Sequence, residues 1–313
     1  MAADLDLLVL GDANPDLVLH GGDVVPAFGQ AERLVESATL TLGGSGAILA
    51  SGAAKLGLRV GICAIVGDDL FGRFVVERLA DAGVRTGGVV VDGSASTGVT
   101  VVLSGSEDRA ILTMPGTIAA LRRERLDPSM LTAARHVHVS SYYLQRLLAP
   151  ELQSVFDEVR ASGATTSLDP NWDPSGAWDA GLVELLHAVD VFLPNAIEAT
   201  RIAHTSEVDA AARSLASRAK LVVVKDGERG AIAFDGEDVY RADALPSGAV
   251  DSTGAGDSFD AGFLAAWLRG EPTDRALALG NACGSLSTRA IGGVDAQPTL
   301  EEALAVLAEG SLA

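Results

Sequence analysis

Basic side chains are scarce in this sequence, and their scarcity excludes one class of partner. The 313 residues include 23 lysines and arginines against 42 aspartates and glutamates, which gives a net charge of −19. Because proteins bind nucleic-acid backbones through basic surfaces, we expect no nucleic-acid partner. A bound nucleotide remains compatible with this charge, since Mg²⁺ and backbone amides can neutralise phosphate at a single site.

Cysteines and long apolar runs are also rare. Cys63 and Cys283 lie in apolar surroundings, without a C-x-x-C pair or a Cys/His cluster of metal-binding spacing. They are therefore expected to be buried, reduced thiols of a cytoplasmic protein. No uncharged apolar run reaches about 18 residues, so we expect no membrane span. The start, MAADLDLLVLG, carries acids where a secretory signal needs bases.

Short apolar runs alternate with segments of helical period along most of the chain. Such alternation is typical of a mostly parallel sheet with helices on both faces. Because no linker, repeat or low-complexity tract interrupts it, the sequence predicts one α/β domain over residues 1–313. The predicted strands are residues 5–10, 58–66, 137–140, 165–168, 189–193 and 220–224, and helices are predicted at 47–56 and around 71–79.

Two regions break this rhythm. Residues 16–20 alternate like a strand but follow the first strand with no helix between them, and residues 97–103 and 109–114 form a strand pair joined by 104–108. We interpret these pieces as a small β-sheet that projects from the main body, from about 14–40 and 88–118. The alternative is that they extend the edge of the main sheet.

The stretch DSTGAGDSFDAGFLAAW, residues 251–267, has the small residues of a phosphate-binding loop but three acids and no base. Apolar residues at helical spacing predict a helix that begins near Gly256. Free amides at a helix start attract anions, and Gly254, Ala255 and Gly256 let a phosphate approach the backbone closely. Asp257 would then take the proton from a hydroxyl that attacks phosphorus. The alternative is that its acids merely favour a helix N-terminus.

Asp251-Ser-Thr-Gly-Ala-Gly-Asp257 closely resembles the C-terminal signature of the ribokinase-like (PfkB) family of carbohydrate kinases, and other family elements follow in order over nearly the whole chain. The resemblance implies a ribokinase-like α/β fold with a small β lid, and ATP and Mg²⁺ as ligands. It assigns Asp257 as the catalytic base and the amides of Gly254, Ala255 and Gly256 as the anion hole. It also implies a monovalent cation, such as K⁺, near Asp251.

Asn195-Ala-Ile-Glu198 resembles the Asn-x-x-Glu element with which the family organises Mg²⁺ and phosphate. It follows a predicted strand, where open α/β sheets place ligands. The resemblance therefore implies that Asn195 contacts the nucleotide and that Glu198 holds Mg²⁺ through water. The alternative is a capping box, with Asn195 as the helix cap and Glu198 reaching back to it.

Three further segments resemble the family's sugar-binding elements. The resemblance implies that Asn14 and Asp16 bind sugar hydroxyls, that Gly43 and Gly44 lie against the sugar, and that Asn171 also contacts it. Two positions depart from the family pattern: Ile48 stands where an asparagine is common, and Asp173 replaces an arginine. Without that arginine, acidic sugars become less favoured substrates.

The nucleotide side is expected to include the turn after the strand at 220–224. By resemblance, Lys225, Gly227 and Gly230 line the nucleotide, and Asn281, in the helix after the catalytic one, lies toward the adenine. The alternatives are a solvated lysine at a strand end for Lys225 and helix packing for Asn281.

These expectations predict an ATP-dependent kinase that phosphorylates a hydroxyl of a small carbohydrate, under a lid that excludes water and through which a homodimer forms. A nucleoside kinase of the same family is the alternative substrate class, although aromatic residues make up only 4% of the chain. A more distant alternative is an NAD-dependent oxidoreductase, since Gly44-Ser-Gly46 opens a helix with Asp68 about 20 residues on, but Leu49 stands at the third glycine. A non-catalytic sugar-binding protein is the last.

Overall fold

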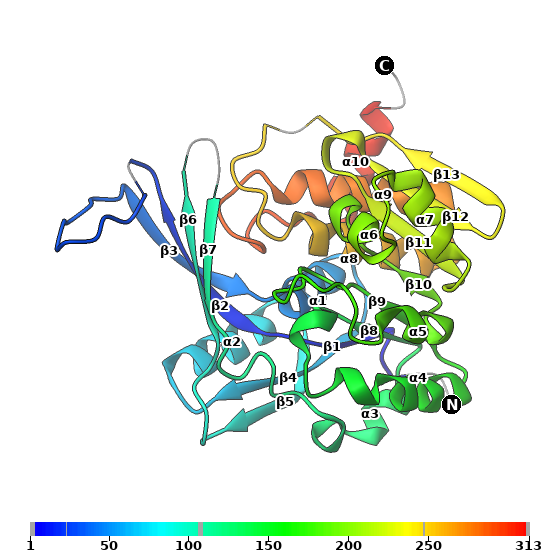
Figure 1. Cartoon of the computed structure of the whole chain (residues 1–313), viewed down its shortest axis with the longest axis horizontal. Helices are drawn as coiled ribbons and strands as arrows, with labels where there is room; N and C mark the ends of the chain where they lie inside the picture. Colours follow the sequence, from blue (N-terminus) through cyan, green and yellow to red (C-terminus); the bar gives the residue numbers. More distant parts are fainter. Residues whose placement is uncertain (1–3, 23, 106–108, 247, 311–313) are drawn as a thin grey trace.

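Two β-sheets of unequal size form the framework of the computed structural model, which describes residues 4–22, 24–105, 109–246 and 248–310 (Figure 1). The larger sheet has nine strands in the order β13-β12-β11-β10-β9-β8-β1-β4-β5. Its strands pair in parallel except at β11–β12 and β12–β13. They are β1 Leu7–Leu10, β4 Val60–Gly67, β5 Arg85–Asp92, β8 His136–Val139, β9 Thr165–Leu168, β10 Val191–Phe192, β11 Leu221–Lys225, β12 Ala231–Asp235 and β13 Asp238–Ala242.

Helices cover both faces of this sheet, as the sequence predicts. Successive side chains of a strand point to opposite faces, so in β1 Leu7 and Val9 pack into one core with α1 and α8, while Leu8 and Leu10 pack into the other with α4. The helices are α1 Ser45–Lys55, α2 Leu70–Asp81, α3 Pro128–Ala133, α4 Leu152–Ala161, α5 Leu182–Leu185, α6 Ala196–Ile202, α7 Val208–Ala216, α8 Ala255–Trp267, α9 Thr273–Ser287 and α10 Leu300–Gly310.

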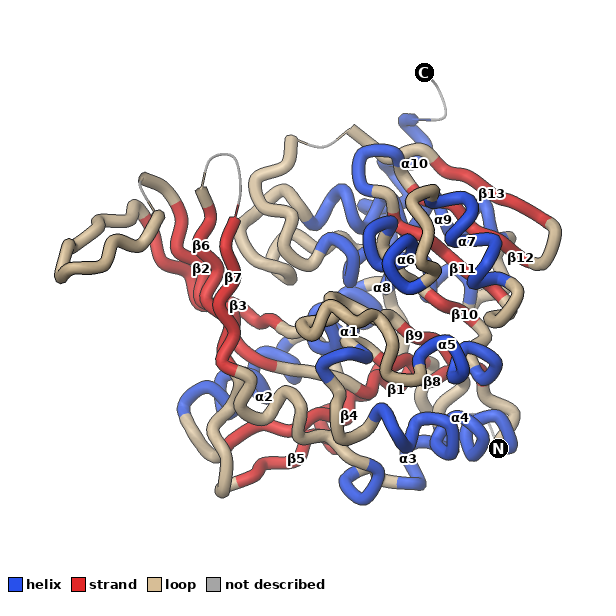
Figure 2. Tube along the Cα trace, in the orientation of Figure 1, coloured by secondary structure: helices blue, strands red, loops and turns tan. Residues whose placement is uncertain are grey.

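The smaller sheet projects from one side of the molecule (Figures 1 and 2). Its strands are β2 Asn14–His20, β3 Ser37–Gly43, β6 Val99–Ser104 and β7 Arg109–Met114, in the order β3-β2-β6-β7. It is separate from the main sheet, so the interpretation of these pieces as an edge extension is wrong. The β2–β6 pair is parallel and the two outer pairs are antiparallel.

The predicted bounds of this projection need correction. Residues 88–92 belong to β5, which pairs with β4 in the main sheet, and β3 continues beyond residue 40 to Gly43. The connection at 106–108 falls outside the described residues. Local sequence pattern identifies a strand, but the choice of sheet depends on partners far away in the chain.

The strand order places the carboxyl ends of β1 and β8 at a topological switch point. The chain runs from β1 outward through β4 and β5, then returns to the other side of β1 with β8 and continues through β9, β10 and β11. Open α/β sheets bind ligands outside the strand ends at such a point. Within the described ranges, no helix combines the length and the apolar character needed to cross a membrane.

Candidate active site

Helix α8 begins at the glycine-rich loop predicted to bind phosphate. Gly254 precedes the helix with a φ of 70°, a left-handed conformation that suits glycine. The Ala255 amide donates to the Ser252 carbonyl at 3.3 Å. The amides of Gly254 and Gly256 meet no hydrogen-bond acceptor among the described residues. Of the three expected anion-hole donors, two are therefore available and Ala255 is engaged in the turn that shapes the loop.

Asp257 lies in the first turn of α8 and is partly buried. Burial, together with the negative charges of Asp169 and Asp12, raises its pKa to about 7, against the lowering effects of Lys225 and of a hydrogen bond from Ser45. A carboxylate with a pKa near neutrality is suited to general-base catalysis.

The predicted sugar-binding residues converge beyond the end of β1. The Asn14 side-chain amide donates to Asp16 at 3.1 Å and to Thr100 at 3.3 Å. A Cβ atom on Gly43 would overlap the Asp16 carboxylate, and one on Gly44 would come within 2.8 Å of the Asn14 Oδ1. Both glycines are thus required by the two polar side chains. Burial and the neighbouring Asp12 raise the pKa of Asp16 to about 7.

Asn171 connects the strand ends to the first glycine loop. Its side-chain amide donates to Ser45 at 3.1 Å and to Ser141 at 3.0 Å, from a backbone with a φ of 54°. Because Ser45 also bonds to Asp257, the hydroxyl of Ser45 joins the expected sugar contact to the expected base.

Asn195 and Glu198 form the capping box of α6, so the structural alternative for this pair is confirmed. The Asn195 side chain accepts from the Glu198 amide at 2.9 Å, and the Glu198 Oε2 accepts from the Asn195 amide at 2.8 Å. Burial first, and then the charge of Asp169, raises the pKa of Glu198 to about 8. A buried acid held among other acids favours a bound cation, so the cap does not exclude a second role.

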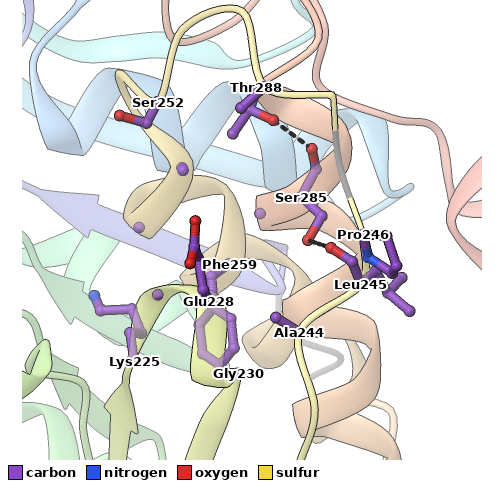
Figure 3. Close-up of a pocket in the computed structure, with 15 residues that line it drawn as sticks. Lys225, Glu228, Gly230, Ala244, Leu245, Pro246, Ser252, Phe259, Ser285 and Thr288 are labelled. Atoms are coloured by element: carbon purple, nitrogen blue, oxygen red, sulfur yellow. Dashed lines mark hydrogen bonds between the residues drawn. The ribbon is translucent and has the colours of Figure 1, made fainter. Parts of the chain in front are cut away.

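Lys225, which the resemblance places beside the nucleotide, pairs with two acids of the protein. Its ammonium donates to Asp169 at 2.5 Å and to the two oxygens of Asp260 at 3.1 and 3.0 Å. Figure 3 shows the amine directed away from the other labelled residues. Burial would lower the pKa of Lys225, but the two carboxylates outweigh it and raise the pKa. Its three donors are therefore satisfied within the protein.

A cavity of about 580 Å³ opens beside the start of α8 (Figure 3). Gly227 and Gly230, which are expected to line a nucleotide, contribute to the lining of this cavity. Asn281 is not among the lining residues, and its amide donates to the carbonyls of Ala242 at 2.9 Å and Asp243 at 3.0 Å. The full lining is Lys225, Gly227, Glu228, Gly230, Ala244, Leu245, Pro246, Ala249, Ser252, Ala255, Gly256, Phe259, Gly284, Ser285 and Thr288.

Three further positions from the sequence analysis make contacts within the protein. Asp251 accepts from the amides of Thr253 and Gly292, both at 2.9 Å, and so closes the loop before α8. Ile48 is buried beside Gly254. Asp173 accepts from the amide of Trp178 at 2.7 Å and organises its own loop.

The match to a family model decides among the predicted classes. Residues 4–300 match the model described as pfkB family carbohydrate kinase. The chain belongs to the PfkB family. It is therefore an enzyme, a phosphotransferase that uses a hydroxyl group as acceptor. The prediction from the glycine loop and Asp257 is confirmed at this level, and the oxidoreductase alternative is not supported.

PfkB relatives of known name differ in their substrates. The chain is 32% identical to an ATP-dependent ribose-1-phosphate kinase of Halopiger xanaduensis, over 97% of this chain and 98% of the relative. It is 30% identical to a nucleoside kinase of Methanothermobacter thermautotrophicus, over 86% and 85%. The structure of an Arabidopsis thaliana ribokinase complexed with ribose and ATP superposes with a TM-score of 0.82 at 25% identity, covering 98% of this chain and 99% of that one.

Sequence reasoning on this PfkB chain missed three residues of the site. Asp12 accepts from the amides of Ser45 at 3.2 Å and Gly46 at 3.1 Å, and thereby holds the start of α1. Ser45, within Gly44-Ser-Gly46, and Asp260, within residues 251–267, were given no role from the sequence either. Their nearness to the glycines and to Asp257 was the available signal, but the residues that they contact are distant in sequence.

Proposed function

We propose that this protein is an ATP-dependent kinase that transfers the γ-phosphoryl group to a hydroxyl of a small carbohydrate. One observation carries the proposal: Gly256 lines the cavity, directly precedes Asp257, and has an amide that meets no acceptor among the residues the structure describes. In a nucleotide bound in that cavity, the terminal phosphate would lie at the Gly256 amide. An acceptor hydroxyl between Asp16 and Asp257 would then attack the phosphorus from the side opposite the leaving group.

Each residue has one task in this scheme. Asn14, Asp16 and Asn171 bind and orient the sugar, and Gly43 and Gly44 leave it room. One carboxylate oxygen of Asp257 accepts the proton of the attacking hydroxyl. The free amides at the start of α8 stabilise negative charge on the transferred group.

The residues present fit a Mg²⁺ ion that arrives with ATP. In the described part of the chain, no cluster of three or more acids, histidines or cysteines forms an all-protein metal site. Glu198 keeps one carboxylate oxygen outside its capping bond and has a raised pKa among other acids. Glu198, with Asn195 beside it, would hold the ion through water, and the ion supplies charge neutralisation on the phosphates.

The carbohydrate class is favoured over nucleosides by the acceptor side of the site. Its expected contacts are the polar side chains of Asn14, Asp16 and Asn171, which suit a polyol. A nucleoside would need an apolar slot for its base. Because relatives are named as a ribose-1-phosphate kinase and as a nucleoside kinase, any test of substrates must include both carbohydrates and nucleosides.

The smaller sheet is proposed to be the lid and the contact surface of a homodimer. Ile111, Leu112 and Met114 on β7 have exposed fractions of 55%, 60% and 45%, which is high for apolar side chains. Light scattering coupled to size exclusion tests this part: a monomer at micromolar concentration would contradict it.

An ADP-release screen tests the kinase. It includes pentoses, hexoses, ribose 1-phosphate and nucleosides with Mg²⁺·ATP, with and without K⁺, and Asp257→Asn serves as the inactive control. Turnover of at least one sugar, absent from the control, supports the proposal. If only nucleosides support ATP consumption, the protein is a nucleoside kinase instead. If no acceptor supports turnover, the proposal is refuted.

A further inference from the structure

A buried charged cluster, the triad Lys225, Asp169 and Asp260, lies beneath the first turn of α8. Its side chains come from the end of β11, the end of β9 and α8, and their exposed fractions are 12%, 8% and 0%. The ammonium lies 2.5 Å from Asp169 and 3.0 Å from the nearer oxygen of Asp260. Neither the sugar nor the nucleotide scheme uses this triad.

We propose that Lys225 is a positioning residue for phosphoryl transfer, which ties the first turn of α8 to the strand ends and places a fixed cation beside Asp257. This inference rests on the proposed function and deepens it. It replaces the expected role of Lys225 as a ligand of ATP phosphate.

The geometry supports the positioning role first. Asp260 follows Asp257 by three residues, so both acids lie on the same side of α8. A Cβ on Gly256 would stand 3.7 Å from the Lys225 Nζ, so the ammonium lies under the turn that carries the free amide. An ion pair at this point fixes the base and the amide relative to β9 and β11.

The charge balance supports the electrostatic role. The groups that act on Asp257 are Asp169 beyond β9, Asp12 beyond β1, Lys225 at the end of β11 and, from α6, Glu198. Lys225 is the cation among these groups. Burial raises the pKa of Asp260, and the Lys225 ammonium, which contacts both of its carboxyl oxygens, acts in the opposite direction.

Removal of the cation gives a kinetic signature. In Lys225→Met, Asp257 is surrounded by acids and has no positive neighbour, so its pKa rises. The acid limb of the pH profile of kcat therefore moves to higher pH by about one unit. We expect kcat at pH 7 to fall at least about tenfold, while KM for ATP changes less than about threefold. Lys220→Met, an exposed lysine at the start of the same strand, is the matched control.

A folding defect needs a separate variant. In Lys225→Met/Asp260→Asn, the asparagine amide can donate to Asp169 in place of the lysine, so thermal stability should recover. If Lys225 only stabilises the fold, activity recovers with stability. If it positions and polarises Asp257, the acid limb stays displaced.

The outcomes separate this inference from the proposed function. A KM for ATP raised more than about tenfold with an unchanged pH profile would make Lys225 a phosphate ligand, and unchanged kinetics would deny it any role; either result overturns the proposal. If the unsubstituted protein has no kinase activity, the proposed function fails, and carboxyl ¹³C NMR still tests the inference. The signal that disappears in Asp257→Asn must titrate at higher pH in Lys225→Met than in the unsubstituted protein.

Discussion

Substitution of Asp257 by asparagine is expected to remove activity and to increase stability at the same time. As the proposed general base, Asp257 contributes about 10² to 10⁴ in kcat, or about 3–5 kcal/mol of barrier. The carboxylate is costly to the fold, because its pKa is raised from 3.8 to about 7, primarily by burial. Asparagine keeps the size of the side chain and removes the charge.

The sign of the stability effect follows from the raised pKa. The protonated group favours the folded state, so its contribution is complete below about pH 4 and is lost as pH rises through about 7. The shift corresponds to at most about 4 kcal/mol, and we expect about 2 kcal/mol because the side chain is partly open to solvent. Asp257→Asn should therefore exceed the unsubstituted protein in unfolding free energy by about 2 kcal/mol at pH 8, and by less than half of that at pH 5.

Two measurements on one preparation check this reasoning. ADP release gives kcat, and urea unfolding at pH 8 and pH 5 gives the free energies. Asp235→Asn, on an exposed strand end, is the control and should change neither quantity. The reasoning is refuted if Asp257→Asn retains more than about a tenth of kcat, or if it is less stable than the unsubstituted protein at pH 8.

Three other substitutions probe single contacts. Gly43→Ala should raise KM for the sugar at least about tenfold and leave ATP binding unchanged, because the new Cβ overlaps the Asp16 carboxylate; equal loss of both affinities in calorimetry would contradict this. Glu198→Gln keeps an oxygen that accepts the capping hydrogen bond, so the melting temperature should not change. The Mg²⁺ concentration that gives half the maximal rate should rise several-fold. An unchanged Mg²⁺ dependence would count against a metal-binding role of Glu198. Asp173→Ala should cost about 1–3 kcal/mol of unfolding free energy through the lost Trp178 bond, with normal kinetics; a changed KM would place it in the site.

The sequence predicted the buried parallel strands well, but not the antiparallel strands at one end of the main sheet or the sheet to which β5 belongs. Apolar runs such as 137–140 and 165–168 coincide with β8 and β9 within one residue. β12 and β13 were not predicted, and residues 88–92 of β5 were assigned to the smaller sheet. β13 and β5 are the edge strands of the main sheet, and edge strands are covered on fewer sides, so their apolar pattern is weaker; β12 is buried, but its antiparallel partners cannot be identified from local sequence.

The candidate site shows the same limit at the level of side chains. The loop before α8 and its aspartate were identified because glycine and helix-start rules are local. The carboxylate partners of Lys225 were not predicted, because they are 56 and 35 residues away in the chain. Asp12 was missed for a similar reason: the amides that it caps are more than 30 residues away.

The parallel pairing of β2 with β6 has a consequence for how the molecule assembles. Their partners, such as His20 and Ser104, are 84 residues apart, and the intervening chain contributes α1, β4, α2 and β5 to the main body. That intervening structure must be in place before the two strands can meet, so the smaller sheet should form late in refolding. Its backbone amides should accordingly exchange with deuterium sooner than those of β1 and β4, and limited proteolysis should cut there before the rest of the chain opens.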